Sequence, residues 1–323
     1  MTESNSTLPW RSWFKTPKQM EIKDDGEMLI SGLMPYGNTF FGGLPGHGKS
    51  YLALCIARAL VFGRSLMGHF AVPRKHNVIY LTPEVGETGL KKRLNTLRMG
   101  EHDDGFLVRT LSDGDSRLSD TRLIEAVKAL KPVIFLDTMA RFNKVRDENQ
   151  AAEFSMGVAE QIFKLREAGA EGVITLHHAN KSSGQEGAKP TLENTLRGTG
   201  DIGAIADCVY NVYCSDLTHF VTRVTCVKMR DAEPPDEFEF RGRPHLDKDG
   251  DLFLLRAPGM SSEDLEDQRL QLIDSLFAET PAAGWREITK ALHMNRPNCQ
   301  ALLTKAGWWK GKGKYATWQR RAE

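Results

Sequence analysis

The chain has 323 residues, and its 43 Lys and Arg residues nearly balance its 42 Asp and Glu residues. This length suggests a core of normal size with one smaller appendage, and the balanced charge gives no global sign of a nucleic-acid partner, so any basic patch must be local. Five scattered cysteines without a C-x-x-C pair argue against a disulfide framework or structural zinc. The absence of a signal-like start and of a long apolar run leads us to expect a cytoplasmic protein that is neither exported nor membrane-embedded.

Short apolar runs alternate with helical stretches after a polar arm of residues 1–27. The runs that predict strands cover residues 38–42, 77–82, 106–110, 132–137, 172–177, 208–214 and 220–229. Residues 49–62 and 153–168 carry apolar side chains at a spacing of three and four and end near glycines, as helices do. The alternation predicts an α/β fold with a mostly parallel sheet flanked by helices, which the last strands extend in antiparallel fashion.

The texture of the sequence changes near residue 258, after the linker-like Ala257-Pro258-Gly259. We therefore assign residues 28–258 to the core domain and residues 259–323 to a small C-terminal domain. In the second, helices predicted at 262–277, 285–292 and 296–306 precede a glycine-punctuated hairpin. This order is typical of a winged helix-turn-helix.

Residues 43–50 read GLPGHGKS and lie between a predicted strand and a predicted helix. In such a loop the glycines let successive backbone N–H groups cradle phosphate oxygens at the N-terminus of a helix. Lys49 would neutralise the β and γ phosphates of ATP, and the Ser50 hydroxyl would bind Mg²⁺. The sequence therefore predicts a nucleotide site at Gly43, Leu44, Pro45, Gly46, His47, Gly48, Lys49, Ser50 and Tyr51.

Polar residues at the ends of three other predicted strands complete this site. Asp137 ends the strand VIFLD, the Walker-B arrangement in which an aspartate holds Mg²⁺ through water; an aspartate that caps a turn is the alternative. Glu84 is the candidate base that orients the attacking water, with Glu87 as its rival. Of the tandem His177 and His178, only one is expected to face the nucleotide, because neighbours on a strand point opposite ways. We assign the γ-phosphate sensor to His178, with a packed polar residue as the alternative.

These motifs resemble those of the RecA/DnaB superfamily, and most closely the RepA-like group of plasmid-type hexameric replicative helicases. The resemblance covers about residues 28–229 and rests on GLPGHGKS, LTPEVGE, VIFLDT, RDENQAAEFSMG, TLHHANK, LRGTGDIGAIADCVYNVY and VKMRD. It implies a ring, usually a homohexamer, with ATP between neighbouring subunits. By resemblance, Lys228 and Arg230 match fingers that reach the neighbour's nucleotide, and Arg197 matches a second family arginine. Surface salt bridges are the alternative for all three.

The resemblance also implies a central channel that holds single-stranded DNA. One loop that would line it follows Asp137, and the other covers residues 180–196 and includes Lys189. In the C-terminal domain, the recognition helix and the wing carry the local excess of positive charge. The predicted DNA-binding residues are Arg141, Lys144, Lys181, Arg296, Lys310, Lys312 and Lys314. Flexible loops and a protein-interaction module are the alternatives.

Two functions stay open at this point. The first is an ATP-driven ring motor on DNA, a RepA-like replicative helicase of a plasmid, phage or other mobile element. The second is an ATP-switched DNA-binding replication initiator, loader or regulator that contacts duplex DNA and does not unwind it. Strong stimulation of ATP hydrolysis by single-stranded DNA separates the two. A small-molecule kinase is disfavoured because no acceptor-binding lid is evident.

Overall fold

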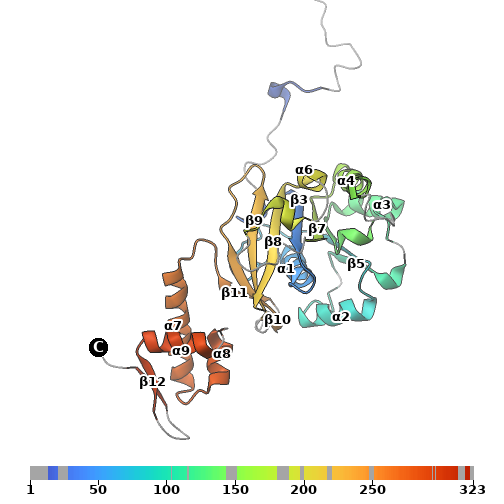
Figure 1. The fold of residues 1–323 in the computed structure, drawn as a ribbon. Coiled ribbons are helices and arrows are strands. Elements are labelled where there is room, and N and C mark those ends of the chain that lie inside the picture. Colours follow the sequence, from blue (N-terminus) through green and yellow to red (C-terminus); the bar gives the residue numbers. More distant parts are fainter. Residues whose placement is uncertain are drawn as a thin grey trace, which may run out of the picture.

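The computed structural model of the protein describes residues 14–20, 28–102, 104–114, 116–142, 151–179, 189–196, 200–216, 220–246, 251–292, 294, 296–311 and 317–320. The main strands in chain order are β3 (Gly37–Gly43), β4 (Val78–Thr82), β5 (Phe106–Thr110), β6 (Val133–Leu136), β7 (Gly172–His178), β8 (Cys208–Asp216), β9 (Val221–Met229), β10 (Phe238–Leu246) and β11 (Leu252–Arg256). They form a sheet in the order β11-β10-β9-β8-β3-β7-β6-β4-β5 (Figure 1). The strands from β8 to β5 run parallel, so the expected α/β fold is confirmed.

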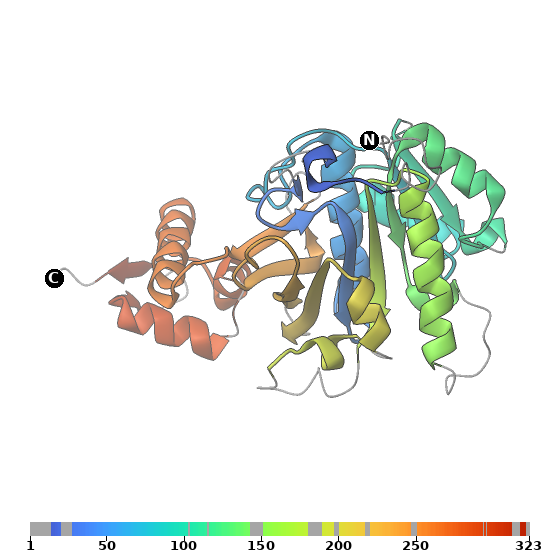
Figure 2. The same ribbon diagram turned by 90° about the horizontal axis from the view of Figure 1, so that it is seen from above.

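Helices cover both faces of the parallel strands (Figure 2). They are α1 (Lys49–Phe62), α2 (Glu87–Thr96), α3 (Thr121–Leu130), α4 (Ala151–Glu167), α5 (Leu192–Thr195) and α6 (Gly200–Ile205). Because side chains alternate along a strand, Phe40 and Phe41 of β3 enter different hydrophobic clusters. One cluster contains α1 and α2, and the other contains α3, α4 and α6. The central strands are therefore buried on both faces. The polar residues that follow them lie at the carboxyl ends of the parallel strands.

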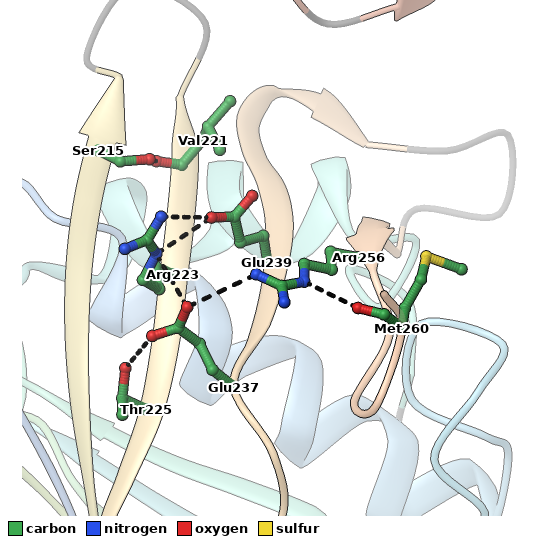
Figure 3. A network of polar contacts seen from close by, with 8 residues as sticks. All are labelled: Ser215, Val221, Arg223, Thr225, Glu237, Glu239, Arg256 and Met260. Atoms are coloured by element: carbon green, nitrogen blue, oxygen red, sulfur yellow. Dashed lines mark hydrogen bonds and ion pairs between the residues drawn. The ribbon is translucent and has the colours of Figure 1, made fainter. Parts of the chain in front are cut away.

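The sheet continues beyond β8 in antiparallel fashion through β9, β10 and β11. A polar network ties these strands together on one face (Figure 3). Arg223 of β9 donates from Nε and Nη2 to Glu239 Oε1 at 3.0 and 2.9 Å, and Thr225 Oγ1 donates to Glu237 Oε2 at 2.8 Å. Arg256 of β11 approaches the same Glu237 at 3.9 Å. The predicted antiparallel extension of the sheet is present. The sequence did not predict β10 and β11 as strands, because charged residues and a proline interrupt the alternation of apolar and polar residues that is typical of a strand.

The C-terminal part consists of α7 (Ser262–Glu279), α8 (Trp285–Leu292), α9 (Arg296–Lys305) and an antiparallel pair, β12 (Trp308–Lys310) with β13 (Trp318–Arg320). Figure 1 shows it beside the β10 and β11 edge of the sheet. Its small core contains Ile273, Ile288 and Leu303, and the Phe277 and Trp318 rings stack with centroids 5.2 Å apart. The element order follows the expectation; the winged helix and the domain boundaries stay predictions. Among the described helices, none has the length and hydropathy needed to cross a lipid bilayer.

A buried carboxylate anchors the start of β11 to the P-loop side of the fold. Asp251 accepts hydrogen bonds from the backbone N–H groups of Met67 and Leu252, both at 2.8 Å. It also lies 3.8 Å from the Arg58 guanidinium of α1, and both side chains are only 8% exposed. Removing one partner of such a pair leaves the other charge buried without its counter-charge.

We therefore expect Asp251→Ala to lower the free energy of unfolding by about 3–5 kcal/mol. Urea denaturation followed by circular dichroism measures this change. The control is Asp267→Ala on the exposed face of α7, where the change should stay within about 0.5 kcal/mol. Equal effects of the two substitutions would show that Asp251 does not anchor β11.

Candidate active site

A cavity of about 310 Å³ lies at the carboxyl edge of the parallel strands, around the loop between β3 and α1. Its lining comes from several segments that are distant in the chain and consists of Pro45, Gly46, Gly48, Lys49, Ser50, Tyr51, Glu84, Arg93, Thr138, His178, Cys214, Phe220 and Thr222. The strand register brings these segments together, since Gly43 lies beside His178 and Leu136 lies beside both Leu81 and Thr175. A second cavity, of about 220 Å³, lies between β5 and α3 and has no P-loop residue in its lining.

The loop conformation depends on glycines at two positions. Gly46 and Gly48 have φ angles of +81° and +89°, in the left-handed region that L side chains rarely adopt. Gly48 is the N-cap of α1, which begins at Lys49. The first N–H groups of α1 have no partners within the helix, and the helix dipole favours negative charge there. This local geometry suits a phosphate group.

Lys49 places a buried positive charge beside this loop. The residue is 6% exposed, and its Nζ donates to the carbonyl oxygens of Gly43 and Leu44 at 2.7 and 2.8 Å. Burial lowers the pKa of Lys49 to about 8, although the charges of Asp137 and Glu84 act in the opposite direction. Phosphate oxygens in the cavity would stabilise the charged ammonium, which is the role predicted for Lys49.

Asp137 follows the last residue of β6 and is 4% exposed. It accepts hydrogen bonds from Ser50 Oγ at 3.1 Å and from the buried Tyr80 hydroxyl at 2.8 Å. Burial raises its pKa, while these two hydrogen bonds lower it. Carboxylate and hydroxyl oxygens suit Mg²⁺. Asp137 and Ser50 could thus supply two oxygen ligands to a Mg²⁺ that takes its others from nucleotide and water. Among the described residues, no group of three or more His, Cys, Asp and Glu side chains could hold a metal ion by itself.

Glu84 is the acid that the structure brings to the cavity. Its side chain is 30% exposed, and its Oε1 accepts hydrogen bonds from Thr138 Oγ1 at 2.7 Å and from Arg141 Nε at 3.3 Å. The rival Glu87 begins α2 and is not part of the lining. Position therefore favours Glu84 over Glu87 for contact with a bound nucleotide.

Three histidines near the P-loop differ in position, since one lines the cavity and another joins the P-loop to β8. His178 lines the cavity, whereas His177 is 6% exposed and absent from the lining. His47 of the P-loop accepts a hydrogen bond on Nδ1 from the backbone N–H of Cys214 at 3.0 Å, and its ring packs 5.4 Å from Tyr213. Burial and then the charge of Lys49 lower the pKa of His47. A neutral His47 thus fastens the P-loop to β8.

Lys228 and Arg230 lie at the opposite edge of the sheet from the P-loop. Cys208 pairs with Met229 of β9 and with Thr39, near the start of β3. Lys228 Nζ donates to Gly203 O at 2.8 Å, and Arg230 forms an ion pair with Asp207 at 2.9 Å. Neither residue lines the cavity of its own chain, so the finger role, which requires a second subunit, stays a prediction. Arg197 lies outside the described residues.

The predicted DNA-binding residues that the structure describes have contacts within the chain. The Arg141 side chain is 64% exposed and pairs with Glu84. The Arg296 guanidinium lies 4.9 Å from the Trp285 ring centroid, and Lys310 Nζ donates to Ala282 O and Ala283 O at 3.1 and 3.0 Å. Contact with DNA stays a prediction for these residues. Lys144, Lys181, Lys312 and Lys314 lie outside the described residues.

Several site residues were not identified from the sequence. Tyr80 sits in the middle of an apolar strand, where its hydroxyl gave no signal. Arg93 lines the cavity from α2 and lies 6.0 Å from the Tyr51 ring centroid. The spacing of Leu90 and Leu94 on the buried face of α2 could have revealed that helix. Thr138, Cys214, Phe220 and Thr222 complete the set that only the fold brings together.

The parallel sheet, the glycine loop and the buried Lys49 and Asp137 define a P-loop ATPase with a RecA-like fold. A family model described as an AAA domain, AAA_25, matches residues 19–184, and the chain belongs to this family. The match covers about half of the chain and includes the P-loop, Glu84, Asp137 and His178. The P-loop ATPase class expected from the motifs is thereby confirmed, and the RepA-like assignment stays a prediction.

The solved structures that are similar to the chain include two ATPases. The first is an ATPase domain that is 15% identical over 67% of this chain and 84% of its own, with a TM-score of 0.48. The second, a DnaB-like replicative helicase studied with primase, is 15% identical over 71% of this chain and 64% of its own, with a TM-score of 0.51. The matched part thus spans less than two thirds of that helicase chain. No curated protein matches the sequence.

We expect Thr138→Val to lower kcat for ATP hydrolysis roughly tenfold, because the carboxylate of Glu84 loses a hydrogen bond while the side-chain shape is kept. KM should stay within about twofold, since a base that acts in the chemical step contributes little to substrate binding. Steady-state kinetics checks both values. Thr138→Ser retains the hydroxyl and should restore kcat. Equal kcat values for the two variants would show that this hydrogen bond does not position Glu84.

Proposed function

We propose that the protein is an ATP-hydrolysing, ring-forming motor on DNA, specifically a RepA-like replicative helicase of a plasmid, phage or other mobile element. The main support is the separation of two sets of polar residues on one sheet. Lys49, Asp137 and Glu84 meet at the carboxyl edge, whereas Lys228 and Arg230 lie at the opposite edge. An ATPase arranged in this way needs a second subunit to bring the two sets together.

Within one subunit, the chain's own residues bind and orient the substrate. The P-loop N–H groups and Lys49 hold the phosphates, and Ser50 and Asp137 would hold Mg²⁺. When bound, Mg²⁺ neutralises negative charge on the β- and γ-phosphate oxygens. Glu84 accepts the proton of the attacking water, and Thr138 keeps its carboxylate directed at the cavity. His178 lies beside the same cavity as the proposed γ-phosphate sensor.

Between subunits, Arg230 and Lys228 supply positive charge to the neighbour's nucleotide. The Arg230 side chain is 48% exposed, so breaking its ion pair with Asp207 requires little free energy. A cation placed at the γ-phosphate in trans is worth about 10³–10⁵ in rate. Hydrolysis in this arrangement requires assembly, which is the property expected of a ring motor.

DNA contact is proposed at the channel loops and in the C-terminal part. Arg141 lies on the segment after Asp137 and pairs with Glu84, so a DNA-facing residue is directly linked to the candidate base. Residues 285–323 contain nine Lys or Arg and two Glu, the local positive charge that a neutral chain would need for DNA. The alternative is an ATP-switched initiator, loader or regulator that binds duplex DNA and does not unwind it.

Replacing Glu84 by Gln should lower kcat about 100-fold or more, because the amide cannot accept the proton of the attacking water. ATP binding should persist, since Lys49 and the P-loop are unchanged. Steady-state ATPase assays and calorimetric titration with ATP measure the two effects. Glu87→Gln is the matched control and should retain activity. Loss of activity in the control with retention in Glu84→Gln would assign the base to Glu87.

A complementation experiment tests the proposed ring. Lys49→Ala lacks a functional phosphate site and retains its finger, whereas Arg230→Ala retains its site and lacks the finger. We expect each variant alone to be inactive with single-stranded DNA, and a mixture of the two to regain hydrolysis. Native mass measurement reports the assembly. Activity of Arg230→Ala alone, or no recovery on mixing, would contradict the trans finger. Hydrolysis by a monomer that ignores single-stranded DNA would favour the switch.

A further inference from the structure

The cavity extends to both sides of the P-loop strand. Glu84 and Asp137 follow β4 and β6, and His178 is the last residue of β7; these three strands all lie on one side of β3 in the sheet. Cys214, Phe220 and Thr222 belong to the β8 and β9 hairpin on the other side of β3. Because hydrolysis takes place at the γ-phosphate, that end of the nucleotide must lie beside Glu84 and Asp137. The lining residues of the β8 and β9 hairpin lie on the other side of β3 from these two acids.

This hairpin is fixed against the P-loop by contacts on both of its strands. The N–H of Cys214 donates to His47 Nδ1 at 3.0 Å. On β9, Thr222 lies next to the N-cap of α1: a Cβ added at Gly48 would be in van der Waals contact with Thr222 Oγ1, at 3.4 Å. The two strands are also joined where Ser215 Oγ donates to the Val221 carbonyl at 3.2 Å (Figure 3). Phe220, immediately before Val221, is thus held at the cavity wall by its neighbours.

The chemistry of this side of the cavity differs from that of the phosphate side. Its described lining, Cys214, Phe220 and Thr222, has no charged side chain, whereas the rest of the lining carries Lys49, Glu84 and Arg93 together with the Tyr51 ring. An aromatic ring stacks favourably on a flat heterocycle, and every nucleobase has a π-face that accepts such a contact. A hydrocarbon ring next to a phosphate cradle is therefore complementary to the base of a nucleoside triphosphate.

We propose that Phe220 forms the nucleobase subsite of this ATPase, with the base stacked on the phenyl ring between Cys214 and Thr222. The inference rests on the proposed hydrolysis of ATP in the same cavity. It gives the β8 and β9 hairpin, on the other side of β3 from Glu84 and Asp137, a role in binding the nucleoside. Phe220 contributes to binding of the nucleoside and not to the chemical step. Because stacking does not read the edge of the base, its loss weakens ATP and GTP alike.

The test compares ATP with inorganic tripolyphosphate, which carries the phosphates without a nucleoside. For Phe220→Ala we expect the KM for ATP to rise about tenfold or more, with kcat retained within about twofold. The inhibition constant of tripolyphosphate should change by less than about twofold, because the P-loop is intact. Phe220→Trp should restore the KM. Phe163→Ala, which removes a 49% exposed ring on α4, serves as the control and should leave all values unchanged.

Two results would overturn the inference. One is an unchanged KM for ATP in Phe220→Ala. The other is an equal loss of ATP and tripolyphosphate binding, which would show that the substitution distorts the phosphate cradle. Calorimetric binding of a non-hydrolysable ATP analogue keeps this test separate from the proposed function. A wild-type protein that binds the analogue without hydrolysing ATP would refute the proposed function, while the Phe220→Ala comparison would still decide the nucleobase subsite.

Discussion

The site depends on two opposite charges, Lys49 and Asp137, that are both buried at the carboxyl edge of the parallel sheet. A low-dielectric environment penalises each charged form, so burial lowers the pKa of Lys49 to about 8 and raises that of Asp137. The fold offsets these penalties with hydrogen bonds from the ammonium to loop carbonyls and from two hydroxyls to the carboxylate. The Tyr80 hydroxyl, although it lies in an apolar strand, donates one of these hydrogen bonds to Asp137.

Elements whose cause is local were predictable from the sequence. The helix after the P-loop was placed at residues 49–62, where α1 lies, because apolar spacing starts it and Gly63 in the left-handed region ends it. The helix predicted at residues 285–292 coincides with α8 for the same kind of reason. The phosphate loop was also readable, since its glycines are required by backbone angles at Gly46 and Gly48. Each of these features is encoded within about fifteen consecutive residues.

Features that depend on distant pairing were not predictable in the same way. Phe220 lines the cavity only because β9 pairs with β8 and β8 lies beside β3. The motif VKMRD identified Arg230 as a candidate residue, but no local sequence pattern predicts its ion pair with Asp207. Strand β10 mixes charged residues with apolar ones, and its partners Arg223 and Arg256 lie on other strands. The sequence therefore identified which chemically active residues are present, and the fold determines which of them come together.

The bond between His47 and Cys214 joins residues 167 positions apart in the chain. A second long-range contact, from the Asn38 N–H to Asp207 Oδ2, spans 169 positions and fixes the start of the same strand. During translation the phosphate loop leaves the ribosome long before the strand that braces it. Non-local contacts of this kind form late, after the entropy of a long loop has been overcome. A nascent chain therefore gains the brace between the phosphate loop and β8 only after Cys214 has been synthesised.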